Sequence, residues 1–352
     1  MTLSRDSSAR SARTSRLRDS MSGGSPDPPR NSELMMSYNG ELLYLSRDDV
    51  LRCEVGPSDL LAAVSDAFKA KAVQGARTAK PMSFEANGGY FDGKGGYFSG
   101  FSGLKWYGYF AANAGHGQRD FWPMIILNEA QTGLPVAFID GTWISEVRTA
   151  AISAAGATRL ADPNAQSIAF IACGQQARSH LQAFGAAFPL ERVLAHGRRR
   201  ETAEAFANEA RAMGYDAEVV EEPRRAIEDA DIVISSVPHR TLNDGFLDAS
   251  WLKRDAFVSM VDLGYSWQRR SFGEIELLAT DDRDQVPPGR GYNTDRVPEK
   301  DLADLLSETR GDHAPAGRAA LIFSGSGLAD VAVARFVVDR AKSMGIGRKL
   351  PL

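Results

Sequence analysis

The chain has 352 residues, of which 43% are hydrophobic and 24% charged, a composition typical of globular proteins and a length that allows two domains. Its formal net charge of −4 offers no basic footprint for nucleic acid, and no run of 18 apolar residues indicates a transmembrane helix. Two cysteines, Cys53 and Cys173, are too few for a disulfide scaffold and indicate a reducing compartment. These features predict a cytoplasmic protein and leave small molecules, including anionic ones, as its partners.

The first 37 residues differ in composition from the rest of the chain. Arginines and serines come first, followed by a stretch rich in glycine, serine and proline. Such a segment cannot bury enough apolar surface to offset its ordering entropy, so the sequence predicts a disordered tail over 1–37. A transit peptide is the alternative, but Asp6 and Asp19 argue against it, and a later methionine is a plausible true start.

The predicted elements begin with a domain of mixed α+β type. A strand over Glu41–Leu45 is followed by a helix from Pro57 to about Val73, in which apolar residues recur at helical spacing. From Met82 to Val136 aromatic residues and glycines dominate, which favours antiparallel strands. Turn signals at 91–93 (Phe-Asp-Gly) and 131–133 (Gln-Thr-Gly) predict hairpins at those positions.

A long helix of small residues, Ser145–Leu160, leads into a region where strands and helices alternate. Such alternation predicts a parallel sheet with right-handed crossovers, as in a Rossmann-type α/β domain. The predicted strands are Ser167–Ile171, Arg192–Ala195, Ala217–Val220, Asp231–Ser235 and Ala256–Val261, and the predicted helices are Ala177–Ala187, Glu201–Met213 and Arg224–Glu228. A last amphipathic helix is predicted over Ala329–Met344.

The segment Ile168–Gln176 combines an apolar strand, a tight turn and a helix start, which together present backbone N–H groups and a helix dipole to a pyrophosphate. Its glycine fingerprint is incomplete, because Ala172 and Ala177 stand at the first and third glycine positions. An ordinary strand end made of small residues is the alternative. A later strand that leads into Ser236 and Val237 supports a dinucleotide site, since such ends commonly line the cofactor.

The residue that recognises the adenosine ribose belongs after the next strand, about twenty residues on. An acidic residue there binds the 2′-hydroxyl of NAD, but this chain has Gly197 followed by Arg198, Arg199 and Arg200. Guanidinium groups pair with a 2′-phosphate through charge-assisted hydrogen bonds. The sequence therefore predicts NADP as the cofactor, with NADPH preferred over NADH. The alternative is a solvated basic helix start, which the helix dipole opposes.

From about Leu42 to Gly345 the chain resembles the ornithine cyclodeaminase/mu-crystallin family. The resemblance rests on GLKW at 103–106, ILNEAQTGLPVA at 126–137, SEVRTAAISAAGATRLA at 145–161, ACGQQA, ADIVISSVP and FSGSGLADVAVARFV at 323–337. Within the family, SMVDL and the last of these segments look closest to the branch that makes aminocarboxyethyl-glutamate for diaminopropionate.

The resemblance implies a fold and a domain division. A Rossmann-type parallel-sheet domain over 151–319 is expected to be inserted in a mixed α+β domain that binds substrate and forms a homodimer. That second domain is expected to comprise residues 38–150 and 320–352. The fold class is therefore predicted as α/β.

The resemblance also implies residues that contact the substrate. It assigns Lys105 to hold a carboxylate or polarise an imine, and Asp262 to act as the acid and base at a strand end. The alternatives are a surface lysine and a loop aspartate that caps a turn. Arg77 or Lys80 is expected to supply a second cation for the substrate carboxylate, and Ser326 is expected to contact the substrate.

On the cofactor side, the resemblance places Arg148 near the phosphates, with Thr149 beside it. It places Gly174, Gln175 and Gln176 on the pyrophosphate turn. Together with Arg198 and Arg199 after the second strand of the domain, these residues form the predicted cofactor site, and no metal site is predicted, because the five histidines are scattered.

The leading functional hypothesis is an NAD(P)H-dependent imine reductase or amino acid dehydrogenase, which exchanges hydride at the alpha carbon of an amino or imino acid. Three alternatives stay open. Ornithine cyclodeaminase converts ornithine to proline and ammonia with no net consumption of cofactor. An aminocarboxyethyl-glutamate synthase or dehydrogenase of the diaminopropionate pathway is the second, and a mu-crystallin-like protein that binds NADPH with little catalysis is the third.

Overall fold

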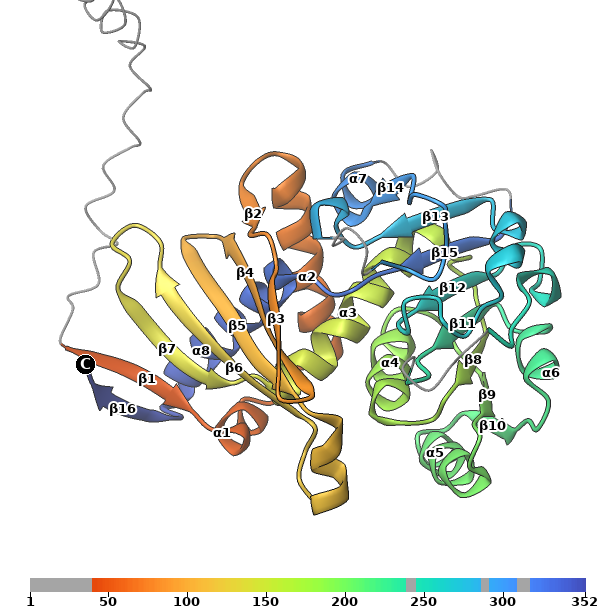
Figure 1. Ribbon diagram of the computed structural model, residues 1–352, viewed down its shortest axis with the longest axis horizontal. Coiled ribbons are helices and arrows are strands. Elements are labelled where there is room, and N and C mark those ends of the chain that lie inside the picture. Colours follow the sequence, from red (N-terminus) through yellow and green to blue (C-terminus); the bar gives the residue numbers. More distant parts are fainter. Residues whose placement is uncertain (1–39, 239–244, 286–290, 309–316) are drawn as a thin grey trace, which may run out of the picture. The chain divides into compact units, whose positions relative to one another are not determined.

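The computed structural model describes residues 40–238, 245–285, 291–308 and 317–352, so the tail predicted over 1–37 lies outside the described residues. Figure 1 shows two β-sheets, one built mainly from the early strands of the chain and one from the later strands, with helices packed between and around them. The predicted α/β class, with a Rossmann-type sheet beside a mixed sheet, is confirmed.

The first sheet has eight strands in the order β16-β1-β7-β6-β5-β4-β2, with β3 paired to β4. All of its strand pairs are antiparallel except that of β1 with β7. Its strands are β1 (Glu41–Leu45), β2 (Ala76–Thr78), β3 (Met82–Ala86), β4 (Gly89–Phe98), β5 (Phe101–Tyr109), β6 (Phe121–Glu129), β7 (Pro135–Asp140) and β16 (Arg348–Pro351). Because β16 is the last strand of the chain, the sheet joins both ends of the described region.

Two hairpins of this sheet turn at pairs of residues with positive φ. Strands β3 and β4 are joined at Asn87-Gly88, with φ of 49° and 79°, and β4 and β5 at Ser99-Gly100, with φ of 51° and 83°. Type I′ hairpin turns require this backbone, which glycine adopts without steric cost. The turn predicted at 91–93 is wrong, because these residues lie inside β4. The turn predicted at 131–133 is confirmed between β6 and β7.

Helix α8 (Gly327–Met344) covers one face of the first sheet and touches β4, β5 and β6. The chain therefore returns to its first sheet after it has built the second one. The remaining helices of this part are α1 (Arg47–Arg52), α2 (Pro57–Ala72) and the 3-10 helix η1 (Ala111–His116). Helix α1 begins with a capping box, in which Ser46 and Asp49 satisfy each other's backbone N–H groups.

The second sheet has eight parallel strands in the order β10-β9-β8-β11-β12-β15-β13-β14. Its strands are β8 (Ser167–Ile171), β9 (Arg192–His196), β10 (Asp216–Val219), β11 (Ile232–Ser235), β12 (Phe257–Met260), β13 (Leu277–Thr280), β14 (Lys300–Asp301) and β15 (Ala319–Ile322). Its helices are α4 (Gln175–Gly185), α5 (Arg200–Ala212), α6 (Pro223–Ile227) and α7 (Leu302–Ser307), with 3-10 turns η3 (Ala249–Trp251), η4 (Arg269–Glu274) and η5 (Arg283–Gln285).

The strand order of the second sheet reverses at β8. Strands β9 and β10 follow on one side, and β11 and β12 lie on the other. In open parallel sheets the crevice at such a reversal, at the carboxyl ends of the strands, is where ligands bind. The central strands are buried on both faces, as their continuous apolar sequences require. Among the described residues, no helix is long and apolar enough to cross a membrane.

Helix α3 (Thr142–Leu160) connects the two sheets and contacts α2, α4 and α8. Its small residues allow this close packing: a Cβ at Gly156 would lie 2.9 Å from a methyl carbon of Leu321. The chain is expected to return to the first domain at residue 320. Strand β15 covers this position, however, and pairs within the Rossmann sheet. The return therefore begins after Ile322.

Candidate active site

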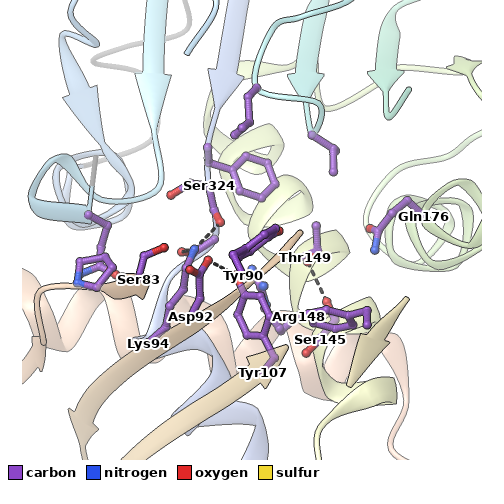
Figure 2. A pocket seen from close by; sticks show the side chains of 18 of the residues that line it. Ser83, Tyr90, Asp92, Lys94, Tyr107, Ser145, Arg148, Thr149, Gln176 and Ser324 are labelled. Carbon is purple, nitrogen blue, oxygen red and sulfur yellow. Dashed lines mark hydrogen bonds between the residues drawn. The ribbon is translucent and has the colours of Figure 1, made fainter. Parts of the chain in front are cut away.

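A cavity of about 1050 Å³ lies between the first sheet and the carboxyl edge of the Rossmann sheet. Its polar wall includes Tyr90, Asp92, Lys94, Tyr107, Arg148 and Gln176. Figure 2 shows Gln176 toward one end and Ser83 toward the other, with Arg148 and Lys94 between them. The wall thus combines side chains of the two sheets, and Gln176 marks the end at which the predicted dinucleotide turn lies.

Lys94, on β4, is a buried cation in the cavity wall that the sequence analysis did not single out. Its Nζ donates hydrogen bonds to the backbone carbonyls of Ser324 (2.6 Å) and Gly325 (2.9 Å). Burial, reinforced by the nearby positive charge of Arg148, lowers the pKa of Lys94. One sequence signal was available: Asp92 and Lys94 are two residues apart in a strand of glycines and aromatics, and therefore share a face.

The predicted substrate lysine, Lys105, lies behind the cavity wall. It is 1% exposed, and its Nζ lies 2.7 Å from Oδ2 of Asp330 on α8. The same carboxylate lies 3.0 Å from Nε of Arg148. Burial, together with Arg148, lowers the pKa of Lys105 to about 7, against the opposing effect of Asp330. The structure therefore gives Lys105 a protein carboxylate as its partner and keeps it out of contact with the cavity.

Arg148 lines the cavity next to Gly325. Its Nε pairs with Asp330, whereas its two terminal nitrogens make no hydrogen bond to any described residue. A Cβ at Gly325 would lie 2.1 Å from Nη1 of Arg148, and the φ of Gly325 is +85°, so only glycine suits this position. The placement of Arg148 near the phosphates stays a prediction; in the structure its guanidinium lies beside Gly325 and close enough to Lys94 to lower its pKa. Thr149 also lines the cavity.

Asp92 and Tyr107 form a polar pair in the wall, from neighbouring strands in direct register. The Tyr107 hydroxyl donates to Oδ2 of Asp92 at 2.7 Å, while Oδ1 is buried and has no hydrogen-bond partner among the described residues. Burial and the Asp92 carboxylate raise the pKa of Tyr107, so its hydroxyl remains a donor. The sequence analysis missed this pair, because it interpreted Asp92 as part of a turn.

Asp262, the predicted acid and base, is 3% exposed and does not line the cavity. Its carboxylate accepts hydrogen bonds from the hydroxyls of Ser235 and Ser266 and from the backbone N–H groups of Val237 and Gly264. Burial raises its pKa. Its chain neighbours line the cavity instead: Val261, Leu263 and Tyr265. Through its hydrogen bonds Asp262 braces the loops after β11 and β12, and its role as acid and base stays a prediction.

The other predicted substrate residues also lie away from the cavity wall. Arg77, at β2, and Lys80 after it are exposed. Ser326 is fully buried, and its Oγ accepts a hydrogen bond from the backbone N–H of Leu328 at 3.1 Å, so it caps α8. Capping residues of this kind satisfy a helix end and do not need a ligand.

The turn after β8 is open at the N-terminus of α4. Gly174 is the N-cap of α4 without a side-chain cap, and a Cβ at this position would meet no atom within 4 Å. The first backbone N–H groups of a helix of 11 residues are therefore available to a phosphate. Ala172 adopts a φ of +83° and donates its N–H to His196, which shapes the turn despite the missing glycine. Gln176 faces the cavity with a buried Oε1 that has no partner among the described residues.

Two further residues of the predicted cofactor site border this turn. Gln175 donates from Nε2 to Glu146 at 3.3 Å, and the backbone N–H of Ser236 donates to Ile171 at 3.0 Å. The second of these bonds extends the pairing of β8 and β11 to their carboxyl ends. Val237, which follows Ser236, is held by its backbone bond to Asp262. Asp262 thus acts on the edge of the predicted cofactor crevice through the backbone.

A buried hydrogen-bond chain fixes the first turns of α4. His180 Nδ1 lies 2.7 Å from the carbonyl oxygen of Gln176, which can only accept, so Nδ1 carries the hydrogen. Nε2 must then accept from the Ser153 hydroxyl at 2.8 Å, and Ser153 in turn lies 2.7 Å from the Ser259 hydroxyl. The chain links α4 to α3 and β12, and thereby holds Gln176 in place.

The stability of the protein is expected to depend on pH through His180. Burial lowers the pKa of His180 from 6.5 to about 4. The unfolded chain therefore binds this proton first, and stability is lost as pH falls from about 6.5 toward 4, by on the order of 3 kcal/mol. In chemical denaturation, the stability advantage of the native protein over His180→Leu should shrink across this range. Parallel pH profiles of the two proteins would contradict the assignment, and His116→Leu, at an exposed position on η1, is the control.

The parallel sheet with its reversal, the open turn at Gly174 and the polar cavity beside it are features of Rossmann-type domains that bind a dinucleotide. The model of the ornithine cyclodeaminase/mu-crystallin family matches residues 56–345. The chain therefore belongs to the ornithine cyclodeaminase/mu-crystallin family, and the resemblance seen in the sequence is confirmed.

Similarity to individual proteins adds detail to the family assignment. The chain is 26% identical over 324 residues to alanine dehydrogenase of Archaeoglobus fulgidus, covering 88% of this chain and 98% of the relative. It is 27% identical over 250 residues to Delta(1)-pyrroline-2-carboxylate reductase of Bacillus cereus, covering 66% and 75%. The solved structure of an archaeal alanine dehydrogenase dimer with bound NAD superposes with a TM-score of 0.77 at 22% identity, covering 89% and 99%. The chain is accordingly an NAD(P)-dependent oxidoreductase of amino or imino acids.

Proposed function

We propose that the protein is an NADPH-dependent imine reductase or amino acid dehydrogenase that exchanges hydride at the alpha carbon of an amino or imino acid. One observation carries the proposal: the cavity beside the open turn offers a guanidinium with free donors, on Arg148, and a carboxylate with a free acceptor, on Asp92. An alpha-amino or alpha-imino acid presents a carboxylate and a nitrogen, which these two groups complement. The nicotinamide supplies or takes the hydride when it is bound.

Arg148 holds the substrate carboxylate. Its terminal nitrogens face the cavity, while Asp330 fixes the guanidinium from behind through Nε. A guanidinium fixed in this way forms two parallel charge-assisted hydrogen bonds to a carboxylate, which orient the alpha carbon as well as bind it.

Asp92 handles the proton on the substrate nitrogen, in place of Asp262. Its Oδ1 is a buried carboxylate oxygen with no hydrogen-bond partner among the described residues, and Tyr107 holds Oδ2. A carboxylate in this position accepts a hydrogen bond from an ammonium or iminium group and exchanges its proton. The contribution of Asp262 is to position the loops after β11 and β12, through its bonds to Val237 and Gly264.

A cofactor-turnover assay tests the proposal. Oxidation of NADPH and NADH is followed with the imines that ammonia forms from pyruvate, glyoxylate and oxaloacetate, and with cyclic imino acids. We expect oxidation with at least one imine, and loss of that activity in Asp92→Asn. Proline formed from ornithine without net cofactor turnover would establish a cyclodeaminase instead. NADPH binding without turnover of any compound would favour a mu-crystallin-like role.

The preference for NADPH is supported by the residues after β9. Arg198 and Arg199 are exposed and make no ion pair to any described residue, whereas Arg200 is paired with Glu221 and Glu204. Two unpaired guanidinium groups are therefore free for a 2′-phosphate. Free thiols at Cys53 and Cys173 agree with a cytoplasmic location, which we also propose.

We further propose a homodimer formed through the face of the first sheet that points away from α8. Gly103 faces α8, because a Cβ there would lie 2.9 Å from Val331, so the next residue of the strand, Leu104, faces the other way. Leu104, Ile126 and Phe138 lie in register on three neighbouring strands and are 36% to 37% exposed. A continuous exposed apolar row of this kind marks an interaction surface.

Ile126→Glu is expected to raise the dissociation constant of this dimer at least a hundredfold, because the symmetric interface would bury the new carboxylate in both subunits. Analytical ultracentrifugation across a concentration series measures the change. Leu51→Glu, at an exposed apolar position on α1 outside the row, should leave the association unchanged. An unaltered sedimentation profile of Ile126→Glu would exclude this face.

A further inference from the structure

Two lysines on neighbouring strands of the first sheet differ in how their charge is balanced. Lys94 on β4 and Lys105 on β5 are cross-strand partners, so their side chains leave the same face of the sheet. Both are buried. Lys105 has a carboxylate of the protein as its partner, since its Nζ lies 2.7 Å from Asp330. Lys94 has two backbone carbonyls and no carboxylate oxygen within 4 Å among the described residues.

The surroundings of Lys94 do not supply the missing counter-charge. Three carboxylates act on it from beyond ion-pair distance: Asp281, Asp330 and Asp92. Burial and the positive charge of Arg148 outweigh them. Asp330 is already engaged by Lys105 and Arg148, one oxygen of Asp92 accepts from Tyr107, and Asp281, whose Oδ1 accepts from the backbone N–H of Asp282, makes no ion pair with Lys94. A buried ammonium without a counter-ion is costly, which is why the pKa of Lys94 is lowered. An anion that enters the cavity and reaches Lys94 stabilises its charged form.

Lys94 is also placed to reach a ligand. It lines the cavity, and an ammonium group has three hydrogens, of which the carbonyls of Ser324 and Gly325 take two. Arg148 also lies beside Gly325 and is the group to which the alpha-carboxylate is assigned. A substrate held by Arg148 therefore has a second cation near it, toward the end of the cavity that is remote from Gln176 (Figure 2).

We propose that Lys94 binds a second carboxylate of the substrate, so that the substrate class is amino or imino acids with two carboxyl groups. The proposal rests on the proposed function, in which Arg148 takes the first carboxylate. Lys94 then acts as a specificity residue. A substrate that carries a neutral group in place of the second carboxylate leaves the buried ammonium unpaired, and the enzyme rejects that substrate. Sites built around a polar partner discriminate strongly against ligands that lack it.

Matched pairs of compounds test the proposal, because a carboxylic acid and its amide differ in charge but hardly in shape. The pairs are aspartate and asparagine, glutamate and glutamine, and N-(carboxymethyl)alanine and its half-amide. NADP reduction gives kcat/KM for each, and calorimetric titration into the protein with bound NADPH gives a dissociation constant without turnover. We expect the acid of at least one pair to exceed its amide about 30-fold in both measurements, which corresponds to one charge-assisted hydrogen bond.

Lys94→Gln keeps a donor for the carbonyls of Ser324 and Gly325 but removes the charge. This variant should reduce the ratio of acid to amide to about threefold or less, whereas Lys69→Gln, at an exposed position on α2 outside the cavity wall, should preserve it. Thermal melting of both variants verifies that they are folded. Lys94→Arg, which retains the charge, should restore part of the preference.

Three results separate the two proposals. A ratio near one in the native protein, or a ratio unchanged in Lys94→Gln, overturns the assignment of Lys94 and leaves the oxidoreductase function in place. If the ratio is unchanged because acid and amide lose equally in Lys94→Gln, Lys94 shares the alpha-carboxylate with Arg148. Selective binding of the acid without turnover of any compound would support the site at Lys94 and contradict the proposed reaction.

Discussion

Arg148→Met is expected to lower kcat/KM for the substrate about a thousandfold while leaving the protein folded. The side chain contributes two cavity-facing donors, and a charged pair that loses one partner in a desolvated site loses 2–5 kcal/mol of interaction free energy or more. Because the carboxylate contact also orients the alpha carbon, kcat should fall as well as KM rise. Steady-state kinetics with the best imine of the turnover assay measures both.

Two comparisons distinguish loss of the carboxylate contact from a general loss of structure. Asp330 retains Lys105 as a partner in Arg148→Met, so the melting temperature should change little. Arg159→Met lies on the same helix, where Arg159 bonds to the carbonyl of Leu306 far from the cavity, and its kinetics should match those of the native protein. Retention of more than a tenth of the native kcat/KM in Arg148→Met would show that another group holds the carboxylate.

Gly197→Asp combined with Arg198→Ala and Arg199→Ala is expected to shift the cofactor preference from NADPH toward NADH by at least a hundredfold. The aspartate supplies the acceptor that a ribose 2′-hydroxyl requires and repels a 2′-phosphate, while the substitutions remove two guanidinium groups without other partners in the described chain. The backbone has room for the change, since the nearest atoms to a Cβ at Gly197 lie 3.8 Å away.

The ratio of kcat/KM for NADPH to that for NADH measures this shift. Arg200→Ala serves as the matched control, because this arginine is the neighbour that already has partners, Glu221 and Glu204. An equal loss with both cofactors in the triple variant would place the arginines outside the ribose site, and a native preference for NADH would contradict the proposal directly.

The alternation of strands and helices made the Rossmann sheet predictable, because apolar strands at regular distances have few other ways to be buried. The predicted strand Ser167–Ile171 matches β8 residue for residue. The hairpins of the first sheet were harder to predict from the sequence. Positive φ at Asn87-Gly88 permits the turn there, and the Asp-Gly pair at 92–93, an equally good local signal, is overridden by pairing with β5.

The active site was predictable by region but not by residue. The sequence predicts one site around Arg148 and the turn at Gly174, and in the structure Arg148 and Gln176 line the same cavity. It selected Lys105 for the substrate, whereas the structure puts Lys94 in the cavity. Both lysines share a face of the sheet, and only the position of Asp330, which lies 225 residues beyond Lys105, decides which of them is paired inside the protein. Contacts between residues so far apart in the chain cannot be inferred from local sequence patterns.

The return of α8 to the first sheet also affects how the protein is made. During synthesis the strands β1 to β7 leave the ribosome first, yet the helix that covers them and the aspartate that neutralises Lys105 and Arg148 are encoded after the whole Rossmann domain. The Rossmann domain can fold as a unit while the earlier sheet still lacks its cover. The substrate half of the cavity is therefore completed last, and a nascent chain that stalls before residue 327 carries two cations and a bare apolar sheet, which chaperones and proteases recognise.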